Sequence, residues 1–384
     1  MAIFASLEWY AEVSQTINQI YREELGRDAD FGGWANWLHH AREGGKDADW
    51  IRARIRESEE WHAIHDAPPL VTLPRLVPAG AVFRLDTGAR VTAVECTDFN
   101  LLARYLSEGA AAIRPVLGER QALGFNMLRV WTAFSGDAIF ESEIGRLVPS
   151  EHPELYDKLP GFCSLCAAHG LYVELTAFTG GPIPGHWENL GRVLPGVTNV
   201  IVELVNENNA HPSANIDTSA YQPLPGVICS HGSNGAEAVP PRPPWDYETF
   251  HTNDAFEWWR KGGHNGMELS QGDAEGQIPP SHKPVMANEN TRPDHDRNVD
   301  HHQDAAAAAA LLIAGSCFHS VSGKKSAPFS DAERPFAEAF VRGARSVNLE
   351  FQEGQYLREE PGPYLRVYSR VLPDGRRETV RIRK

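Results

Sequence analysis

The sequence has few cysteines, and their number is odd. Five cysteines in 384 residues argue against the disulfide framework of a small secreted domain. Cys163 and Cys166 have the spacing of a redox or metal-binding motif, but no second pair with this spacing exists to complete a zinc site. The surrounding segment, Leu159 to His169, is predicted to be a helix, so these two cysteines are expected to be buried helix residues.

The sequence also lacks long apolar runs and clustered positive charge. No window reaches the roughly 18 apolar residues of a membrane-spanning helix, and the first eight residues have no cationic start, so no signal peptide is predicted. The formal net charge of −15 argues against a nucleic-acid partner, because phosphate binding requires clustered lysine and arginine. We therefore expect a soluble protein without a membrane span.

The first 62 residues are predicted to form a helical module. A turn from Leu25 to Trp34 separates segments in which apolar residues recur at helical spacing. Asp28 and Asp30 in this turn are predicted to cap it, because the spacing of a calcium-binding EF-hand fails beyond the first positions. The apolar positions are Ile17, Ile20, Tyr21, Leu25, Trp50, Ile51, Ile55 and Trp61.

Alternating strand and helix segments follow a proline-rich linker at residues 63–80. Residues 82–85 and 90–94 are predicted to form a hairpin-like entry. Counting from residue 91 gives eight strands with crossovers, the pattern of a (β/α)8 TIM barrel over residues 81–346. A small β hairpin extension at residues 347–384 ends the chain. The eight strand segments are 91–94, 125–131, 171–176, 199–205, 227–230, 247–251, 284–287 and 313–319.

Two of these strand segments end in the same pair of polar residues. Asn206-Glu207 follows the fourth segment, and Asn288-Glu289 follows the seventh. The carboxyl ends of parallel barrel strands lie at one end of the barrel, where barrel enzymes have their active sites. Glu207 and Glu289 are therefore predicted to be a carboxyl pair that shares one substrate.

With Arg129 in the second strand and His251 in the sixth, this order of strand ends resembles the clan-A retaining glycoside hydrolases. The resemblance covers about residues 81–345. It implies that Glu207 is the general acid/base and Glu289 the nucleophile, in a reaction without cofactor or metal. It also implies that Arg129, Asn206 and His251 line the substrate site.

The chemistry of retention explains these residue types. One carboxyl must be protonated and the other ionised, about 5–5.5 Å apart. Arg129 is expected to keep Glu289 anionic, while Asn206 donates to the sugar hydroxyl beside the anomeric carbon. Trp131 is expected to stack on a sugar ring, as are the loop residues Trp187 or Trp245.

Other positions leave alternatives open. His319 ends the eighth strand, where a substrate contact and a structural hydrogen bond are both compatible with the sequence. Glu174 and Glu203 lie inside strands and are predicted to pair with basic groups. The family commonly has a tyrosine two positions after the sixth-strand histidine and a tryptophan on strand eight, whereas this sequence has Asn253 and no tryptophan there. Trp258 and Trp259 are predicted to pack a helix against the barrel.

The N-terminal module has a resemblance of its own. It is similar to a small helical repeat domain of bacterial surface and secreted proteins, which implies a docking or spacer role with a protein partner. The matching positions are Tyr21, Leu25-Gly26-Arg27, Asp30, Gly33, Trp37 and Ser58-Glu59.

Three functional hypotheses follow from the sequence. The first is a retaining glycoside hydrolase that cleaves a polysaccharide or glycan, held at a cell surface or in a virion by its helical module. The second is a non-catalytic glycan-binding or structural barrel. The third is a metal-dependent hydrolase, although its residues also fit a solvated loop before a helix. Those residues are Asp294, His295, Asp296, Asp300, His301, His302 and Asp304.

Overall fold

The chain folds into two compact units, Met1–Leu70 and Val71–Lys384. In the part of the chain that the structure describes, no helix is long and apolar enough to cross a membrane. The computed structural model describes residues 2–25, 28–58, 70–134, 146–179, 181–207, 216–232, 244–251, 283–347, 356–359, 364–371 and 375–383.

The first unit contains the helices α1 (Ala2–Leu25), α2 (Phe31–Gly44) and α3 (Ala48–Arg56). Asp30 caps α2 by accepting a hydrogen bond from the Gly33 amide at 2.7 Å, as the turn predicted. Asp28 instead pairs with Arg22. The core of this unit contains six of the predicted apolar residues, which are Ile17, Ile20, Tyr21, Leu25, Ile51 and Ile55.

The second unit is a (β/α)8 barrel, which confirms the predicted fold. Eight parallel strands are hydrogen-bonded in the order β8-β7-β6-β5-β4-β11-β10-β9, and each corresponds to one predicted segment. They are β4 (Ala93–Thr97), β5 (Met127–Trp131), β6 (Tyr172–Phe178), β7 (Val200–Val205), β8 (Ile228–Ser230), β9 (Glu248–His251), β10 (Val285–Thr291) and β11 (Gly315–Phe318).

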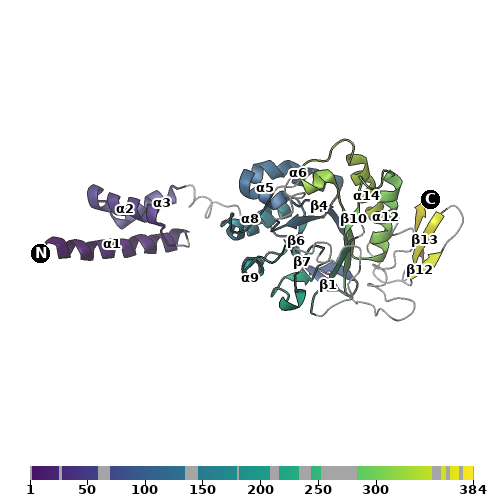
Figure 1. Cartoon of the computed structure of the whole chain (residues 1–384), viewed down its shortest axis with the longest axis horizontal. Coiled ribbons are helices and arrows are strands. Elements are labelled where there is room, and N and C mark those ends of the chain that lie inside the picture. Colours follow the sequence, from purple (N-terminus) through teal and green to yellow (C-terminus); the bar gives the residue numbers. More distant parts are fainter. Residues whose placement is uncertain are drawn as a thin grey trace. The chain divides into compact units, whose positions relative to one another are not determined.

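Helices cover the outside of these strands (Figure 1). Cys163 and Cys166 are buried, free thiols on α8, as the sequence predicted. The long alanine run of α12 is buried, with Ala305 and Ala308 fully inaccessible, which lets α14 pack closely on it. The helices are α5 (Leu101–Glu108), α6 (Ala110–Leu123), α8 (Leu155–Ala168), α9 (His186–Val193), α12 (Val299–Leu312), α13 (Val321–Lys324) and α14 (Arg334–Arg345), with the 3-10 turn η2 (Thr218–Ala220).

A small antiparallel sheet closes the end of the barrel where the strands begin. It contains β1 (Leu76–Ala79), β2 (Val82–Leu85) and β3 (Arg90–Val91). Phe83 is inaccessible and packs with the first residues of the barrel strands. The predicted hairpin entry is thus present, but β1 falls inside the segment predicted to be a linker. Leu76 joins the same apolar cluster, and this burial explains why the segment forms a strand despite its prolines.

The C-terminal extension is a three-stranded antiparallel sheet of β12 (Tyr356–Glu359), β13 (Tyr364–Val371) and β14 (Arg377–Arg383). The predicted hairpin is the pair β13 and β14, and β12 adds a strand that the sequence analysis did not predict. Val380 on β14 is buried and belongs to the main core of the unit.

The barrel ladder has one seam, between β8 and β9. In the described part of the chain these two strands are at opposite ends of the hydrogen-bonded order. Asp246 bridges the start of the seam, because its amide donates to the Cys229 carbonyl at 2.8 Å and its carboxylate accepts from the Cys229 amide at 2.9 Å. Further along, the Ser230 and Thr249 hydroxyls lie 3.5 Å apart. Side chains therefore contribute to closing the barrel here.

Candidate active site

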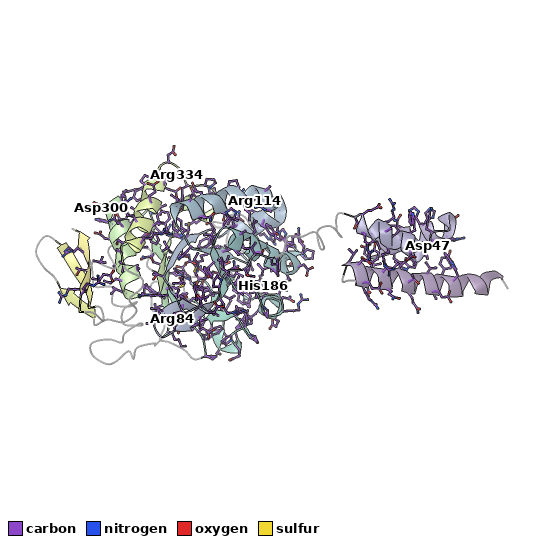
Figure 2. The ribbon with its side chains drawn as sticks, turned by 180° about the vertical axis from the view of Figure 1, so that it is seen from behind. Asp47, Arg84, Arg114, His186, Asp300 and Arg334 are labelled. Atoms are coloured by element: carbon purple, nitrogen blue, oxygen red, sulfur yellow. The ribbon has the colours of Figure 1, made fainter. Side chains whose placement is uncertain are left out.

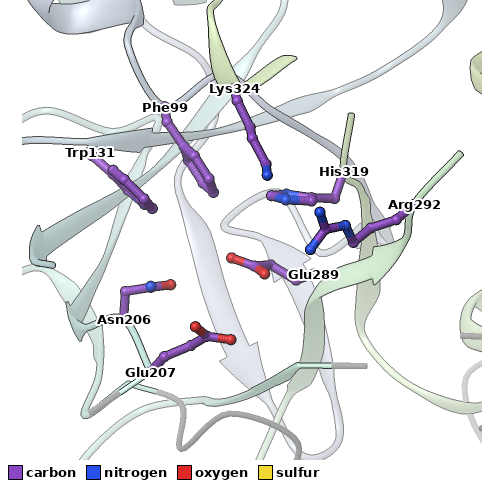
Figure 3. Close-up of a pocket in the computed structure, with 8 residues that line it drawn as sticks. All are labelled: Phe99, Trp131, Asn206, Glu207, Glu289, Arg292, His319 and Lys324. Carbon is purple, nitrogen blue, oxygen red and sulfur yellow. The ribbon is translucent and has the colours of Figure 1, made fainter. Parts of the chain in front are cut away.

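The two predicted carboxyl groups meet at the carboxyl ends of β7 and β10. One oxygen of Glu207, one oxygen of Glu289 and a ring nitrogen of His251 all lie within 4.8 Å of one another. His251 Nδ1 is 2.9 Å from Glu207 Oε1 and 3.6 Å from Glu289 Oε2. Figure 3 shows the two carboxyl groups facing each other across a pocket. The structure thus brings together three residues that are widely separated in the sequence.

The backbone at Glu207 has an unusual conformation. Its φ angle is +43°, in the left-handed region that non-glycine residues rarely adopt. Such a conformation costs on the order of 1–3 kcal/mol, and strained residues of this kind cluster at functional sites. Here the left-handed residue lies two positions after the end of β7 and lines the pocket.

Arg129 on β5 links the carboxyl ends of β7 and β10 through hydrogen bonds. Its guanidinium donates to Glu289 Oε1 at 2.7 Å, to Glu203 Oε2 at 2.6 Å and to Asn206 Oδ1 at 2.7 Å. Its side chain is inaccessible to solvent. A buried arginine with this many acceptors fixes the positions of the side chains around it, because the planar guanidinium donates in set directions.

Glu203 and Glu174 pair with Arg129, as the sequence predicted. Glu203 also accepts from the Thr249 hydroxyl at 3.0 Å and the Asn288 amide at 2.9 Å, and Glu174 accepts from Tyr247 at 2.7 Å. Burial, together with the charge of Glu203, raises the pKa of Glu174 to about 7. These carboxyl groups support the site and do not line the pocket.

The electrostatics of the site favour an ionised Glu289. Burial by itself raises the pKa of Glu289, but the charges of His251 and Arg129 outweigh it, and the pKa is lowered from 4.5. Burial likewise lowers the pKa of His251, but the charge of Glu289 and the hydrogen bond to Glu207 raise it above 6.5. Glu289 is therefore a carboxylate at neutral pH, next to an imidazole whose pKa is raised.

Asn206 has a fixed amide orientation. An arginine can only donate hydrogen bonds, so the bond from Arg129 identifies the atom that it contacts as the Asn206 amide oxygen. The amide nitrogen is then the group available to donate to a ligand. Asn206 is among the residues that line the pocket.

The pocket next to the carboxyl pair has about 340 Å³ of empty space. Trp131 lines it but stacks on Phe99, with ring centroids 3.8 Å apart, so one face of the predicted sugar platform is already covered. His319 lines it too, and its Nδ1 is 2.9 Å from the Thr97 hydroxyl. His319 thus makes a structural hydrogen bond and also lines the pocket, and its contact with a substrate stays a prediction.

Three pocket residues were not predicted from the sequence. Phe99 follows β4 by two residues, Arg292 follows β10 directly, and Lys324 ends the short helix α13. The position of Phe99 and Arg292 just after barrel strands was a signal that could have identified them. Lys324 gave no such signal, because it follows the last strand by six residues.

Other predicted contacts have different surroundings. Trp187 and Trp245 are 5% and 4% exposed and pack edge-to-face on each other, so the prediction that they stack on sugar is wrong for this arrangement. They are buried because Tyr221 and His231 complete an aromatic cluster around them. Asn253 and the pair Trp258 and Trp259 lie outside the described residues.

The histidine and aspartate segment at residues 294–304 does not converge on one point. Asp294 pairs with Arg292 at 3.0 Å, and His301 pairs with Asp296 at 2.8 Å. His302 Nε2 is bonded to the Asp296 carbonyl. Among the described residues, the potential ligand group with suitable distances is Glu207, His251 and Glu289, so the third hypothesis loses its predicted ligands.

Comparisons with known proteins add a likeness of fold. No known sequence family and no curated protein matches this chain. A Bacteroides vulgatus protein named as a glycoside hydrolase has a TM-score of 0.50 at 12% identity, and the match covers 77% of this chain and 66% of that one. The chain shares its barrel with glycoside hydrolases.

Two further solved structures match this chain with lower scores. A glycoside hydrolase family 5 protein, also from Bacteroides vulgatus, has a TM-score of 0.46 at 13% identity, covering 67% of this chain and 65% of that chain. An endo-1,4-β-mannanase from Eisenia fetida has a TM-score of 0.47 at 14% identity, covering 72% of this chain and 96% of that one. At these identities the likeness concerns the fold, and the chemistry depends on the site residues.

Proposed function

We propose that this protein is a retaining glycoside hydrolase that cleaves a polysaccharide or glycan by double displacement. The observation that carries the proposal is the carboxyl pair, with oxygens of Glu207 and Glu289 within 4.8 Å at the carboxyl ends of two barrel strands. Retaining enzymes have their carboxyl groups about 5–5.5 Å apart, whereas inverting enzymes need about 6.5–9.5 Å to admit a water molecule.

In the first step, the carboxylate of Glu289 attacks the anomeric carbon. The bond from that carbon to the leaving oxygen breaks, and Glu207 transfers its proton to the oxygen. The products are an alcohol and a glycosyl ester of Glu289. The ion pair with Arg129 at 2.7 Å keeps Glu289 ionised and oriented for attack.

In the second step, water cleaves this ester. Glu207, now a carboxylate, takes a proton from the water as its oxygen attacks the anomeric carbon, and Glu289 leaves as a carboxylate. His251 Nδ1 is hydrogen-bonded to Glu207 at 2.9 Å, and this contact orients the carboxyl group. The Asn206 amide nitrogen is placed to donate to the hydroxyl beside the anomeric carbon.

The stereochemistry of the product tests this mechanism. We expect the first sugar released from a cleaved glycan to have the anomeric configuration of the substrate, measured by proton NMR before mutarotation. An inverted product would contradict the double displacement. The experiment needs a substrate that is hydrolysed, and a glycan that binds without any hydrolysis would instead support the second hypothesis, a binding barrel.

A chelator separates this mechanism from metal-dependent hydrolysis, since Glu207, His251 and Glu289 have distances that a metal ion could use. We expect EDTA to leave the activity unchanged. The reason is electrostatic, because Arg129 already contacts Glu289 at 2.7 Å and a second cation there would be repelled. Loss of activity with EDTA and recovery with a divalent ion would favour the metal-dependent reaction.

We further propose that the first unit docks the enzyme on a surface or a larger assembly, such as a virion. It has a core of its own and is a separate compact unit. We expect the full chain to sediment with bacterial envelopes or phage particles. Charge reversal of exposed helix residues such as Asp49 on α3 should weaken this co-sedimentation. No sedimentation with either material would contradict a docking role.

A further inference from the structure

The pocket that holds the carboxyl pair also contains two cationic side chains. Arg292 follows the nucleophile strand β10, and Lys324 ends α13 after β11. Figure 3 shows the guanidinium and the ammonium group pointing into the pocket on the side of Glu289. The chain as a whole is acidic, with a formal net charge of −15.

Arg292 is held in place by a neighbour. Its Nε and Nη2 donate to the two carboxylate oxygens of Asp294 at 3.4 and 3.0 Å, and its side chain is 17% exposed. A guanidinium has five N–H donors, and this pair leaves those of Nη1 for a ligand. Asp294 thus orients the guanidinium.

The ionisation of the nucleophile does not depend on these cations. His319 adds no positive charge, because burial lowers its pKa well below 6.5, and the charges of Lys324 and Arg292 lower it further. Arg129 already provides the ion pair that Glu289 needs. Arg292 and Lys324 are therefore in excess of what the nucleophile requires.

Excess cations at this position oppose the proposed chemistry if the sugar is neutral. Positive charge develops on the sugar ring in the transition state, and like charges nearby raise its energy. A sugar that carries a negative substituent removes this penalty, because the substituent pairs with the cations. Two cations beside a nucleophile are thus suited to an acidic sugar.

We propose that the sugar unit bound next to Glu289 carries an anionic group, a carboxylate or a sulfate ester, which Arg292 and Lys324 bind. The substrate would then be an acidic polysaccharide. This inference deepens the proposed function and rests on it for the position of the cleaved bond, but the recognition of the anion can be measured without hydrolysis.

Affinity gel electrophoresis of the full chain tests the recognition step. The gels contain a uronic-acid polymer, its methyl ester, a sulfated galactan, or a neutral mannan. The methyl ester removes the charge with little change in shape. We compare wild type with Lys324→Gln, Arg292→Gln and the double variant. Lys325→Gln is the matched control, because Lys325 is the next residue, is exposed and does not line the pocket.

We expect the wild-type protein to bind an anionic polymer and not the methyl ester. Each pocket variant should weaken binding by about 10-fold or more, the scale of one charged hydrogen bond, and Lys325→Gln should bind like wild type. Binding to the uronic-acid polymer or to the sulfated galactan identifies the anionic group as carboxylate or sulfate.

Equal binding to the acid and its ester, binding to the neutral mannan alone, or unchanged binding by the double variant would overturn the proposal. Hydrolysis of the same polymers is measured in parallel by release of reducing ends. Anion-dependent binding without hydrolysis would contradict the enzymatic function and leave the anion site standing. Hydrolysis of the neutral polymer at the wild-type rate by the double variant would contradict the anion site and leave the enzymatic function standing.

Discussion

Replacement of Glu289 by glutamine is expected to reduce kcat by about 10⁴-fold or more, the scale on which enzymes lose rate when a nucleophile is removed. The amide of glutamine has nearly the same shape but cannot form the glycosyl ester. The loss should be equally large for substrates with poor and with good leaving groups, because the attack on the anomeric carbon is missing in both cases. Initial rates on aryl glycosides with different leaving groups measure this.

Glu207→Ala should show a different pattern. General acid catalysis contributes about 10²–10⁴-fold, and it matters most for a leaving group that must be protonated. We therefore expect a large loss on a poor leaving group and a much smaller loss on dinitrophenolate. A small anion such as azide should restore turnover, because it fills the space of the carboxyl group and attacks the intermediate without a base.

Glu338→Gln is the control for both variants. Glu338 lies on α14 and is exposed, and this substitution should leave the rates unchanged. Equal losses for Glu207→Ala on both kinds of leaving group, with no effect of azide, would mean that Glu207 has a structural role and would sink the assignment of the acid/base.

Arg129→Met is expected to lower the free energy of unfolding by about 3–5 kcal/mol. Removal of one member of a buried ion pair costs this much because the charge of the other member remains buried without a counter-charge. The variant removes the donor that contacts Glu203, Glu289 and Asn206 at 2.6–2.7 Å. Urea unfolding of the full chain measures the change. Arg114→Met is the control, because Arg114 is exposed on α6 (Figure 2), and its effect should stay within about 0.5 kcal/mol.

The deficit of Arg129→Met should depend on pH. In the folded protein burial raises the pKa of Glu203 and Glu289, but Arg129 and His251 outweigh it, so both values are below 4.5. A lowered pKa contributes stability above the unfolded value, and this stability is lost as the pH falls through the folded value. The difference between wild type and variant should therefore stay constant from pH 7 down to about pH 4.5 and shrink as the pH falls further. A deficit that also stays constant below this pH would contradict a charge-based role.

Much of this architecture could be predicted because its signals are local. Buried parallel strands such as β7 are continuous apolar runs, and a polar pair directly after such a run must lie at the end of the barrel where the strands end. The positions of Glu207 and Glu289 follow from this rule. Arg129 lies inside an otherwise apolar strand, and its place at the site was predicted from the family resemblance.

The rest depends on which side chains meet in space. The sequence does not show that Phe99 covers one face of Trp131, or that Tyr221 closes an aromatic cluster around Trp187. Lys324 reaches the pocket only because the chain turns back after β11. The strand β1 was missed because its prolines are typical of a linker, while the apolar contact that orders it comes from the base of the barrel.

The seam between β8 and β9 affects how this barrel tolerates a change of sequence. A backbone ladder survives the replacement of almost any side chain, because every residue except proline supplies the same donor and acceptor. At the seam, only one backbone hydrogen bond, from the Asp246 amide to the Cys229 carbonyl, joins the described residues, and the other contacts come from the Asp246 carboxylate and two hydroxyl groups. Amino-acid substitutions at these few positions would therefore widen the barrel between β8 and β9. We expect evolutionary changes in the shape of this barrel to occur most easily there.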